Sequence, residues 1–240
     1  MQAKILKKWI APLANTPLHP QWLLGRSKDL RPWLQLTGRT LDIGCGDRSL
    51  CQNLPDPSQY IGLDYLPTAT EWYGSKPDVF GDGQALPFDA ASFDSVTLIH
   101  VLEHLPDPGL ALRETWRTLK LDGVLLLEVP CVYPLHDAPL DFQRWTIYGL
   151  RKIVESNGFE VIEAHSEGSP PETAAVLYNL AISELLLSGF SGRPLVWLVA
   201  PLLLLLIPVI NLVGWLLGSL AGNSGYMPSR NWLLARKPRK

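Results

Sequence analysis

Apolar and polar positions change period along the first 170 residues, and this predicts strands that alternate with helices. Short apolar runs predict strands, at residues 40–43, 60–63, 78–80, 93–99, 124–129 and 159–165. Apolar residues at helical spacing predict helices, at residues 20–36, 48–54, 108–119 and 146–156. A turn is expected at residues 120–123. This order is typical of an α/β fold with helices packed on a largely parallel sheet.

The segment Leu41–Asp47 is the one around which the chain is organised. An apolar run carries one acid, Asp42, and breaks at Gly44 and Gly46. A strand that ends in a glycine turn is the phosphate- or nucleoside-binding corner of an α/β sheet, because glycine lets a ligand approach the backbone. A carboxylate aimed into this turn repels a pyrophosphate and attracts a cation. The ligand expected here therefore carries an ammonium or sulfonium group.

The pattern Asp-x-Gly-x-Gly, followed by Asp64 at the end of the next strand, resembles class I S-adenosylmethionine-dependent methyltransferases. The resemblance is to small-molecule and lipid enzymes of the type 11 group. It implies a Rossmann-like sheet of seven strands and S-adenosyl-L-methionine as the cofactor. A nicotinamide-binding domain is the rival interpretation, but Ser49 stands where its third glycine would be.

The resemblance also implies the cofactor-binding residues. Asp64 would hydrogen-bond both ribose hydroxyls, since a carboxylate offers two acceptor oxygens to a diol. Asp82 would contact the adenine amino group, and we interpret Cys45 as a small structural residue of the turn. The complete predicted set is Asp42, Gly44, Cys45, Gly46, Asp64, Tyr65, Asp82, Gly83, Gln84 and His100.

The loop after the fifth strand, residues 133–146, is the candidate acceptor site. It resembles a subgroup pattern that contains His136, Asp141 and Arg144, and these are the predicted catalytic residues. His136 would act as the base, because histidine titrates near neutral pH, and Arg144 offers a rigid fork for an anion. The alternative is an internal ion pair between Asp141 and Arg144 that holds the loop. Glu103 and His104 could be ligands, a base or packing residues, and no metal site is predicted.

Residues 174–221 are strongly apolar, and residues 195–221 contain no charged side chain. That length meets the roughly 20 residues needed to cross a bilayer. Residues 231–237 resemble the family's final strand, which lies antiparallel between strands five and six. The apolar segment is then an insertion whose two ends lie on the same side of any membrane.

We therefore expect a hairpin that enters the membrane and returns. The first arm, 174–190, carries Asn179, Ser183 and Glu184 and is partly amphipathic. Pro201 and Pro208 are expected to divide the second arm into two half-segments. Two side chains of this arm suit interfacial depth, namely Trp197 and Trp215. Four basic residues favour the cytoplasmic face, namely Arg236, Lys237, Arg239 and Lys240.

Composition bears on the expected partners and on the cellular compartment. The net charge of −2 gives no reason to expect a nucleic-acid partner, and three cysteines without metal-ligand spacing suit a reducing compartment. Residues 1–10 carry three lysines among apolar residues and could form a short interfacial helix. The apolar segment could instead be a helical cap that forms a dimer interface or a lid, and the oligomeric state stays open.

The chain is thus expected to have four parts. These are an N-terminal helical segment (1–37), the S-adenosylmethionine-binding core (38–166), an apolar membrane-associated insertion (167–229), and the final strand with a basic tail (230–240). The expected function is methyl transfer, with oxygen as the expected acceptor atom, to a small or membrane-associated molecule such as a lipid, a quinone precursor or a lipid-linked saccharide. The alternative from another class is a non-catalytic cofactor-binding scaffold at a membrane.

Overall fold

The computed structural model describes residues 11–25, 31–54, 56 and 59–239. These fall into two compact units: one holds residues 29–131, 135–166 and 230–240, and the other holds residues 1–28, 132–134 and 167–229. The predicted interfacial helix at residues 1–10 lies outside the described residues.

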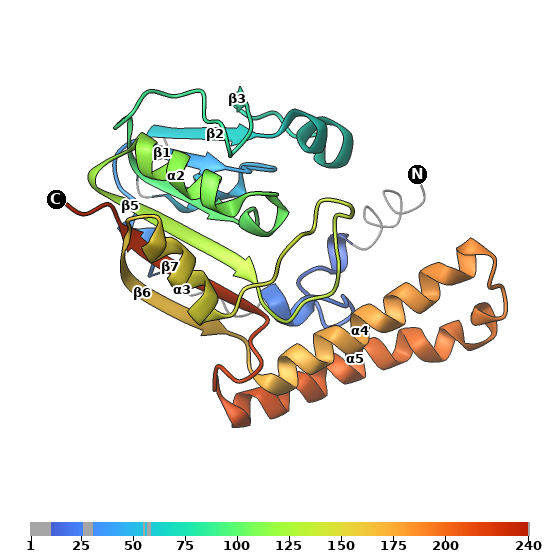
Figure 1. Cartoon of the computed structure of the whole chain (residues 1–240). Coiled ribbons are helices and arrows are strands. Elements are labelled where there is room, and N and C mark those ends of the chain that lie inside the picture. Colours follow the sequence, from blue (N-terminus) through green and yellow to red (C-terminus); the bar gives the residue numbers. More distant parts are fainter. Residues whose placement is uncertain (1–10, 26–30, 55, 57–58, 240) are drawn as a thin grey trace. The chain divides into compact units, whose positions relative to one another are not determined.

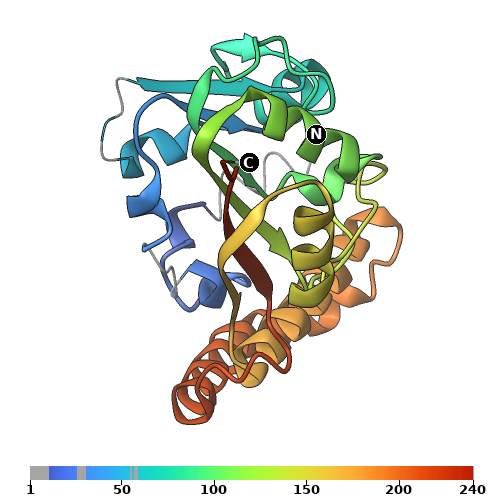
Figure 2. The same cartoon turned by 60° about the vertical axis from the view of Figure 1, so that its left-hand side comes forward.

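The larger unit contains a sheet of seven strands (Figures 1 and 2). The strands are β1 (Thr40–Ile43), β2 (Tyr60–Asp64), β3 (Val79–Phe80), β4 (Phe93–Ile99), β5 (Leu119–Pro130), β6 (Glu160–Glu167) and β7 (Arg230–Arg236). Their order in the sheet is β3-β2-β1-β4-β5-β7-β6. β1 to β5 pair in parallel, whereas β7 pairs antiparallel with β5. The predicted Rossmann-like sheet and the interior position of its last strand are confirmed.

Two apolar clusters of this unit divide the side chains of the central strands, which alternate between the faces of the sheet. Leu125 and Leu127 of β5 belong to the cluster that includes side chains of α2 (Pro108–Thr118) and α3 (Ile147–Ser156). Leu126, between them, belongs to the other cluster, which is completed by the short 3₁₀ turns Trp33–Gln35 and Ser49–Asn53. The sheet is therefore buried on both faces.

Helix α3 begins where the sequence predicts. The Thr146 hydroxyl accepts a hydrogen bond from the Gly149 amide, which satisfies one of the free N–H groups of the first turn. Gly158 follows the helix with φ +91°, a backbone conformation that glycine adopts without strain.

Strand β5 differs from the prediction at its start. We predicted a turn at 120–123, but the strand already begins at Leu119. The pairing with β4 shifts register between Phe93 and Ser95, and Asp122 has φ +61°. The expected turn is thus an irregularity within a longer strand.

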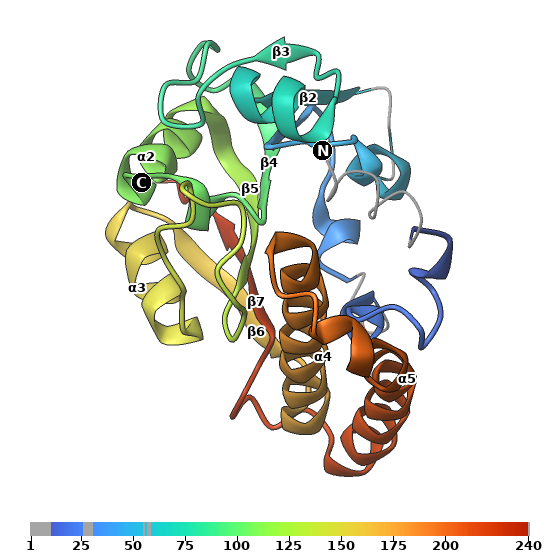
Figure 3. The same cartoon turned by 90° about the vertical axis from the view of Figure 1, so that its right-hand side faces the viewer.

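The smaller unit contains a helical hairpin of α4 (Pro170–Ser188) and α5 (Val196–Ala221), which lie side by side (Figures 1 and 3). Helix α4 begins with a capping box, in which the side chains of Ser169 and Glu172 each accept from the other's backbone amide. Two glycines of α5 allow close packing. A Cβ at Gly214 would lie 2.5 Å from the Ala175 Cβ, and one at Gly218 would lie 2.4 Å from the Ser169 Oγ.

The prediction that prolines divide the second arm is wrong. α5 is one helix of 26 residues that contains both Pro201 and Pro208. Each proline removes one backbone hydrogen bond. Ala200 and Ile207, beside the two prolines, are both buried, so the packed face of the helix continues past both positions.

A continuous helix over residues 20–36 is also not observed. The described parts of this range hold only the 3₁₀ turns Trp22–Gly25 and Trp33–Gln35. Trp22 and Leu23 pack against α4 in an apolar cluster of the smaller unit.

The basic residues near the end of the chain do not form a free cationic tail. Arg236 pairs with Glu160 at 2.7 Å, and Arg239 pairs with Asp122. Lys237 is buried and donates to the Trp116 and Leu119 carbonyls. Lys240 lies outside the described residues. Attraction of this segment to an anionic membrane is therefore not supported.

Candidate functional site

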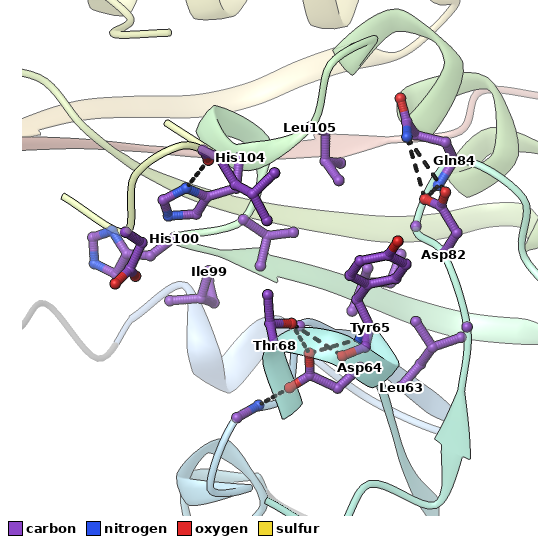
Figure 4. A pocket seen from close by; sticks show the side chains of 18 of the residues that line it. Leu63, Asp64, Tyr65, Thr68, Asp82, Gln84, Ile99, His100, His104 and Leu105 are labelled. Atoms are coloured by element: carbon purple, nitrogen blue, oxygen red, sulfur yellow. Dashed lines mark hydrogen bonds between the residues drawn. The ribbon is translucent and has the colours of Figure 1, made fainter. Parts of the chain in front are cut away.

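A pocket of about 450 Å³ lies at the carboxyl ends of the parallel strands (Figure 4). Gly44 after β1, Asp64 at the end of β2 and His100 after β4 all line it. Ligands of open α/β sheets bind at this edge, outside the strand ends. Eight of the ten predicted cofactor-binding residues line the pocket, namely Gly44, Gly46, Asp64, Tyr65, Asp82, Gly83, Gln84 and His100.

The glycine turn brings bare backbone to the pocket wall. Gly44 has φ +74°, and a Cβ there would lie 2.2 Å from the Val101 Cγ2. Asp64, which is only 6% exposed, accepts the Gly46 amide at 2.9 Å and the Tyr65 amide at 2.8 Å. Backbone donors therefore hold the carboxylate at the rim of the turn.

Two predicted residues do not line the pocket. The Asp42 carboxylate accepts hydrogen bonds from the Tyr60 and Thr97 hydroxyls, both at 2.7 Å, so it is not the pocket-facing anion we expected. Burial raises the pKa of Asp42 to about 6, against the effect of these two hydrogen bonds. Cys45 is buried in an apolar cluster, and burial raises the pKa of its thiol to about 12, which suits the structural role that we expected.

Asp82 and Gln84 form the wall after β3. The Gln84 amide donates to Asp82 Oδ1 at 2.8 Å, which fixes the carboxylate in the turn. The Gln84 side-chain oxygen in turn accepts the Asp107 amide at 2.9 Å. In the view of Figure 4 this pair lies on the side of the pocket opposite His100 and His104.

His100 links the pocket to the interior of the sheet. Its Nε2 lies 3.0 Å from Glu128 Oε1, and its Nδ1 lies 3.8 Å from Glu103 Oε1. Burial lowers the pKa of His100, but the hydrogen bond to Glu128 and the charges of Glu128 and Glu103 outweigh this effect, so the pKa is raised. Its backbone φ is +55°, which is uncommon for a residue with a side chain.

The three predicted catalytic residues do not line the pocket. Arg144 binds both oxygens of Asp141, whose side chain is 1% exposed, and this pairing lowers the pKa of Asp141 to about 2. Asp141 also accepts the His136 amide at 2.8 Å. The internal ion pair that we considered as the alternative is thus observed. The loop reaches the pocket through Asp137 and Leu140 instead.

The fold brings three possible ligand groups together that their spacing along the chain did not reveal. One ligand atom from each of Glu103, His104 and His136 lies within 4.8 Å of the others. His104 also lines the pocket, and its ring packs edge-on against that of His136, with ring centres 4.9 Å apart. Sequence reasoning considered Glu103 and His104 but had no signal that placed His136 beside them.

The pocket fits S-adenosylmethionine. Its volume lies within the range of roughly 300–1,000 Å³ that is typical of small-molecule sites. The turn at Gly44 leaves space that a side chain would fill, and the Asp64 carboxylate at the end of β2 can accept two hydroxyls. The turn at Asp82 supplies a further carboxylate to the wall.

Comparison with known proteins agrees with this geometry. A family described as a methyltransferase domain matches residues 41–127. A demethylmenaquinone methyltransferase of Roseiflexus castenholzii is 39% identical over 103 residues, which are 38% of this chain and 43% of that protein. A ubiquinone biosynthesis O-methyltransferase of Xanthomonas oryzae is 32% identical over 105 residues, which are 39% of this chain and 44% of that protein. The chain thus matches less than half the length of these two relatives.

The fold as a whole is similar to that of solved methyltransferases. A SAM-dependent methyltransferase from Archaeoglobus fulgidus superimposes with a TM-score of 0.54 at 19% identity, over 95% of this chain and 99% of that one. The methyltransferase-domain family thus matches the segment that forms the glycine turn and the strands behind it. Over this segment the chain is similar to methyltransferase domains, and the likeness to the solved structure shows that the fold is shared.

Proposed function

We propose that the chain is an S-adenosylmethionine-dependent methyltransferase. The observation that carries this proposal is the pocket at the carboxyl ends of β1, β2 and β4, where the Gly44 turn and Asp64 meet. S-adenosylmethionine supplies an electrophilic methyl group, and its transfer to an acceptor hydroxyl releases the hydroxyl proton and S-adenosylhomocysteine. A non-catalytic scaffold finds no support among the relatives, which are named as methyltransferases.

The residues of the pocket would act mainly by binding and orientation. Asp64 would hold the ribose hydroxyls, and Asp82 with Gln84 would face the adenine. The acceptor would enter on the side of His104, Leu140 and Asp137. The ion pair between Asp141 and Arg144 would keep the loop that carries these contacts in place.

A quinone precursor or a related amphiphilic ring is the acceptor that the relatives favour, because two of them are named for menaquinone and ubiquinone synthesis. The wall on the acceptor side includes Leu105 and Leu140, which suits an apolar ring. Methylation on oxygen belongs to the same proposal, as does a lipid or lipid-linked saccharide as a less favoured acceptor.

We further propose that the hairpin of α4 and α5 attaches the protein to a membrane. α5 is the one described helix that is long and apolar enough to span a bilayer, with a mean hydropathy of 2.6 over its best window. Leu202, Leu205 and Leu216 of this helix are each more than half exposed. Trp197 and Trp215 are partly exposed, and at a rise of 1.5 Å per residue they lie roughly 27 Å apart along the axis, close to the thickness of a hydrocarbon core.

Calorimetric titration with S-adenosylhomocysteine tests the activity proposal at its first step. Detergent-purified protein is expected to bind it at micromolar concentration, whereas the affinity of Asp64→Ala is expected to be at least tenfold lower. NADH is run beside it and is expected not to bind. Glu163→Gln, on the exposed surface of β6, serves as a control that changes a carboxylate outside the pocket. Folded wild-type protein that binds no S-adenosylhomocysteine would refute the assignment.

Flotation on liposomes tests the attachment. The wild type is expected to float with the vesicles, and a variant with Leu202, Leu205 and Leu216 changed to Ser is expected to stay at the bottom of the gradient. Both proteins should bind S-adenosylhomocysteine equally, which shows that the variant is folded. Recovery of the wild type from cells in the soluble fraction alone, without detergent, would contradict the proposal and favour a soluble cap or dimer interface.

A further inference from the structure

The side chain of Glu103 is fully buried beside the pocket, and its charge is not compensated by hydrogen bonds. Among the residues that the structure describes, neither carboxylate oxygen has a hydrogen-bond partner. Its nearest polar neighbours are rings at longer range, with His104 Nε2 at 3.7 Å and His100 Nδ1 at 3.8 Å from Oε1. A buried carboxylate without hydrogen bonds is costly unless a positive charge lies next to it.

The imidazole of His104 is oriented toward this carboxylate by a backbone contact. Its Nδ1 lies 2.6 Å from the Leu140 carbonyl oxygen, which can only accept, so Nδ1 carries the proton. In the neutral ring Nε2 then presents a lone pair. A lone pair and a carboxylate oxygen 3.7 Å apart repel each other unless a proton or a cation is shared between them.

His136 completes the group from the loop that follows β5. Its Nδ1 lies 3.2 Å from both Asp141 Oδ2 and Arg144 Nη2, and Arg144 binds that carboxylate in turn. A polar group behind each histidine is the usual arrangement around protein-bound metal ions, because it fixes the orientation of the ring. The three ligand atoms of Glu103, His104 and His136 converge within 4.8 Å of one another.

We propose that Glu103, His104 and His136 bind a divalent transition-metal ion. The ion lies between the two imidazoles and the buried carboxylate and supplies a positive charge in direct contact with Glu103. Two nitrogen ligands with one oxygen suit Zn²⁺, Mn²⁺, Fe²⁺ or Co²⁺, whereas Mg²⁺ and Ca²⁺ prefer oxygen ligands. Three protein ligands leave at least one coordination position open, as in catalytic metal sites.

The site adjoins the pocket, since His104 is both a proposed ligand and part of the pocket wall. This step rests on the proposed methyltransferase function. A hydroxyl of the acceptor that coordinates the ion loses its proton to water more readily. Its oxygen lone pair forms the bond to the methyl carbon, and the electron pair of the broken carbon–sulfur bond stays on sulfur.

Titration of the full-length, tag-free protein with MnCl₂ after chelator treatment tests the site. Mn²⁺ is the probe because it has low affinity for cysteine thiols. We expect one ion per chain, with at least tenfold weaker binding in Glu103→Gln and in His136→Ala. Glu163→Gln is the matched control, because Glu163 also lies beside a histidine, with Oε1 2.7 Å from His165 Nε2 on the exposed surface of β6. It should bind Mn²⁺ like the wild type.

Binding of S-adenosylhomocysteine, measured without metal on the same proteins, separates the two proposals. If the wild type binds S-adenosylhomocysteine but neither Mn²⁺ nor Zn²⁺, the metal site is refuted and the cofactor assignment stands. Equal Mn²⁺ affinity in Glu103→Gln, His136→Ala and the wild type refutes the site as well. If the wild type binds no S-adenosylhomocysteine, the proposed function fails whatever the metal result. His136→Ala, a change in a loop, keeps the test valid should Glu103→Gln fail to fold.

Discussion

Single residues around the first turn show two different reasons why one amino acid is required. Gly44 is required by the backbone, since it has a positive φ and faces the Val101 side chain at a distance that leaves no room for a Cβ. Asp42, two positions earlier, is required by its partners, because its carboxylate accepts hydrogen bonds from two buried hydroxyl groups. One short motif therefore combines a position that lines the pocket with a structural one.

Gly44→Ala is expected to weaken S-adenosylhomocysteine binding at least tenfold and to lower the free energy of unfolding by about 2–4 kcal/mol. The positive φ costs about 1–2 kcal/mol for a residue with a Cβ, and the displaced Val101 adds to this. Gly74→Ala is the control: φ is +64° there too, but nothing lies within 4 Å of the added Cβ. Calorimetry measures the affinity and denaturant unfolding measures the stability. Equal losses of both quantities in the two variants would show that backbone strain alone matters.

Asp42 should make stability depend on pH. Its pKa is about 6 in the folded chain, against an ordinary value of 3.8 for an aspartate. The folded state therefore holds this proton more tightly, so the contribution is fully present below about pH 3.8 and is lost as the pH rises through about 6. The accumulated loss at neutral pH is on the order of 3 kcal/mol.

Asp42→Asn removes this titration, because an amide does not ionise. We expect the free energy of unfolding of the wild type to fall relative to Asp42→Asn between roughly pH 4 and pH 7. Denaturant unfolding at each pH measures this difference, in which the other titrating groups largely cancel. A difference that stays constant with pH would contradict the raised pKa.

At the scale of elements, local pattern and long-range packing contribute differently. The strands β1 and β4 could be predicted to the residue, because their apolar runs end at glycine or polar residues. From the sequence alone, a break in α5 at its prolines could not be excluded, because the continuity of this helix depends on how it packs against α4. The same holds for the site. The site positions of Gly44 and Asp64 follow from a local motif. The position of His136 beside Glu103 depends on the path of the loop after β5, which no local motif encodes.

The hairpin also depends on a buried polar contact. The Asn179 amide donates to the Asn211 Oδ1 at 2.9 Å, and Asn211 donates to the Pro17 and His19 carbonyls at 2.7 and 2.9 Å. Asn211 is fully buried, so these hydrogen bonds fix the register of the two helices and hold residues 17–19 against them. Removal of one partner leaves the others buried and unsatisfied.

Asn211→Leu is therefore expected to destabilise the hairpin by about 2–4 kcal/mol. Thermal unfolding in detergent and limited proteolysis near residues 17–19 would measure this. Ser219→Ala, on an exposed position of the same helix, is the control and should change little. A variant as stable and as protease-resistant as the wild type would show that apolar packing alone sets the register.

At the scale of the whole molecule, the insertion leaves and re-enters the sheet unit at nearly one point. The Ser229 amide donates to the Glu167 carbonyl at 2.9 Å, so the two ends of the insertion meet. The sheet unit contains its own apolar clusters and the residues that line the pocket. The hairpin supplies none of these pocket residues.

Replacement of residues 170–227 by a short Gly/Ser linker is accordingly expected to give a protein that is soluble without detergent. It should bind S-adenosylhomocysteine with an affinity similar to that of the full chain, as calorimetry would show. An unfolded product, with poorly dispersed NMR signals, would indicate that the sheet unit depends on the hairpin for stability.

The interior position of β7 has a consequence for biosynthesis. The ribosome releases β5 and β6 first, then the apolar hairpin, and only then the strand that joins them. Until β7 arrives, the edges of β5 and β6 that it joins stay unpaired, and such edges invite wrong pairing. A nascent chain therefore carries these two open edges during the whole time in which residues 167–229 are made, and the sheet is completed only after the helical hairpin.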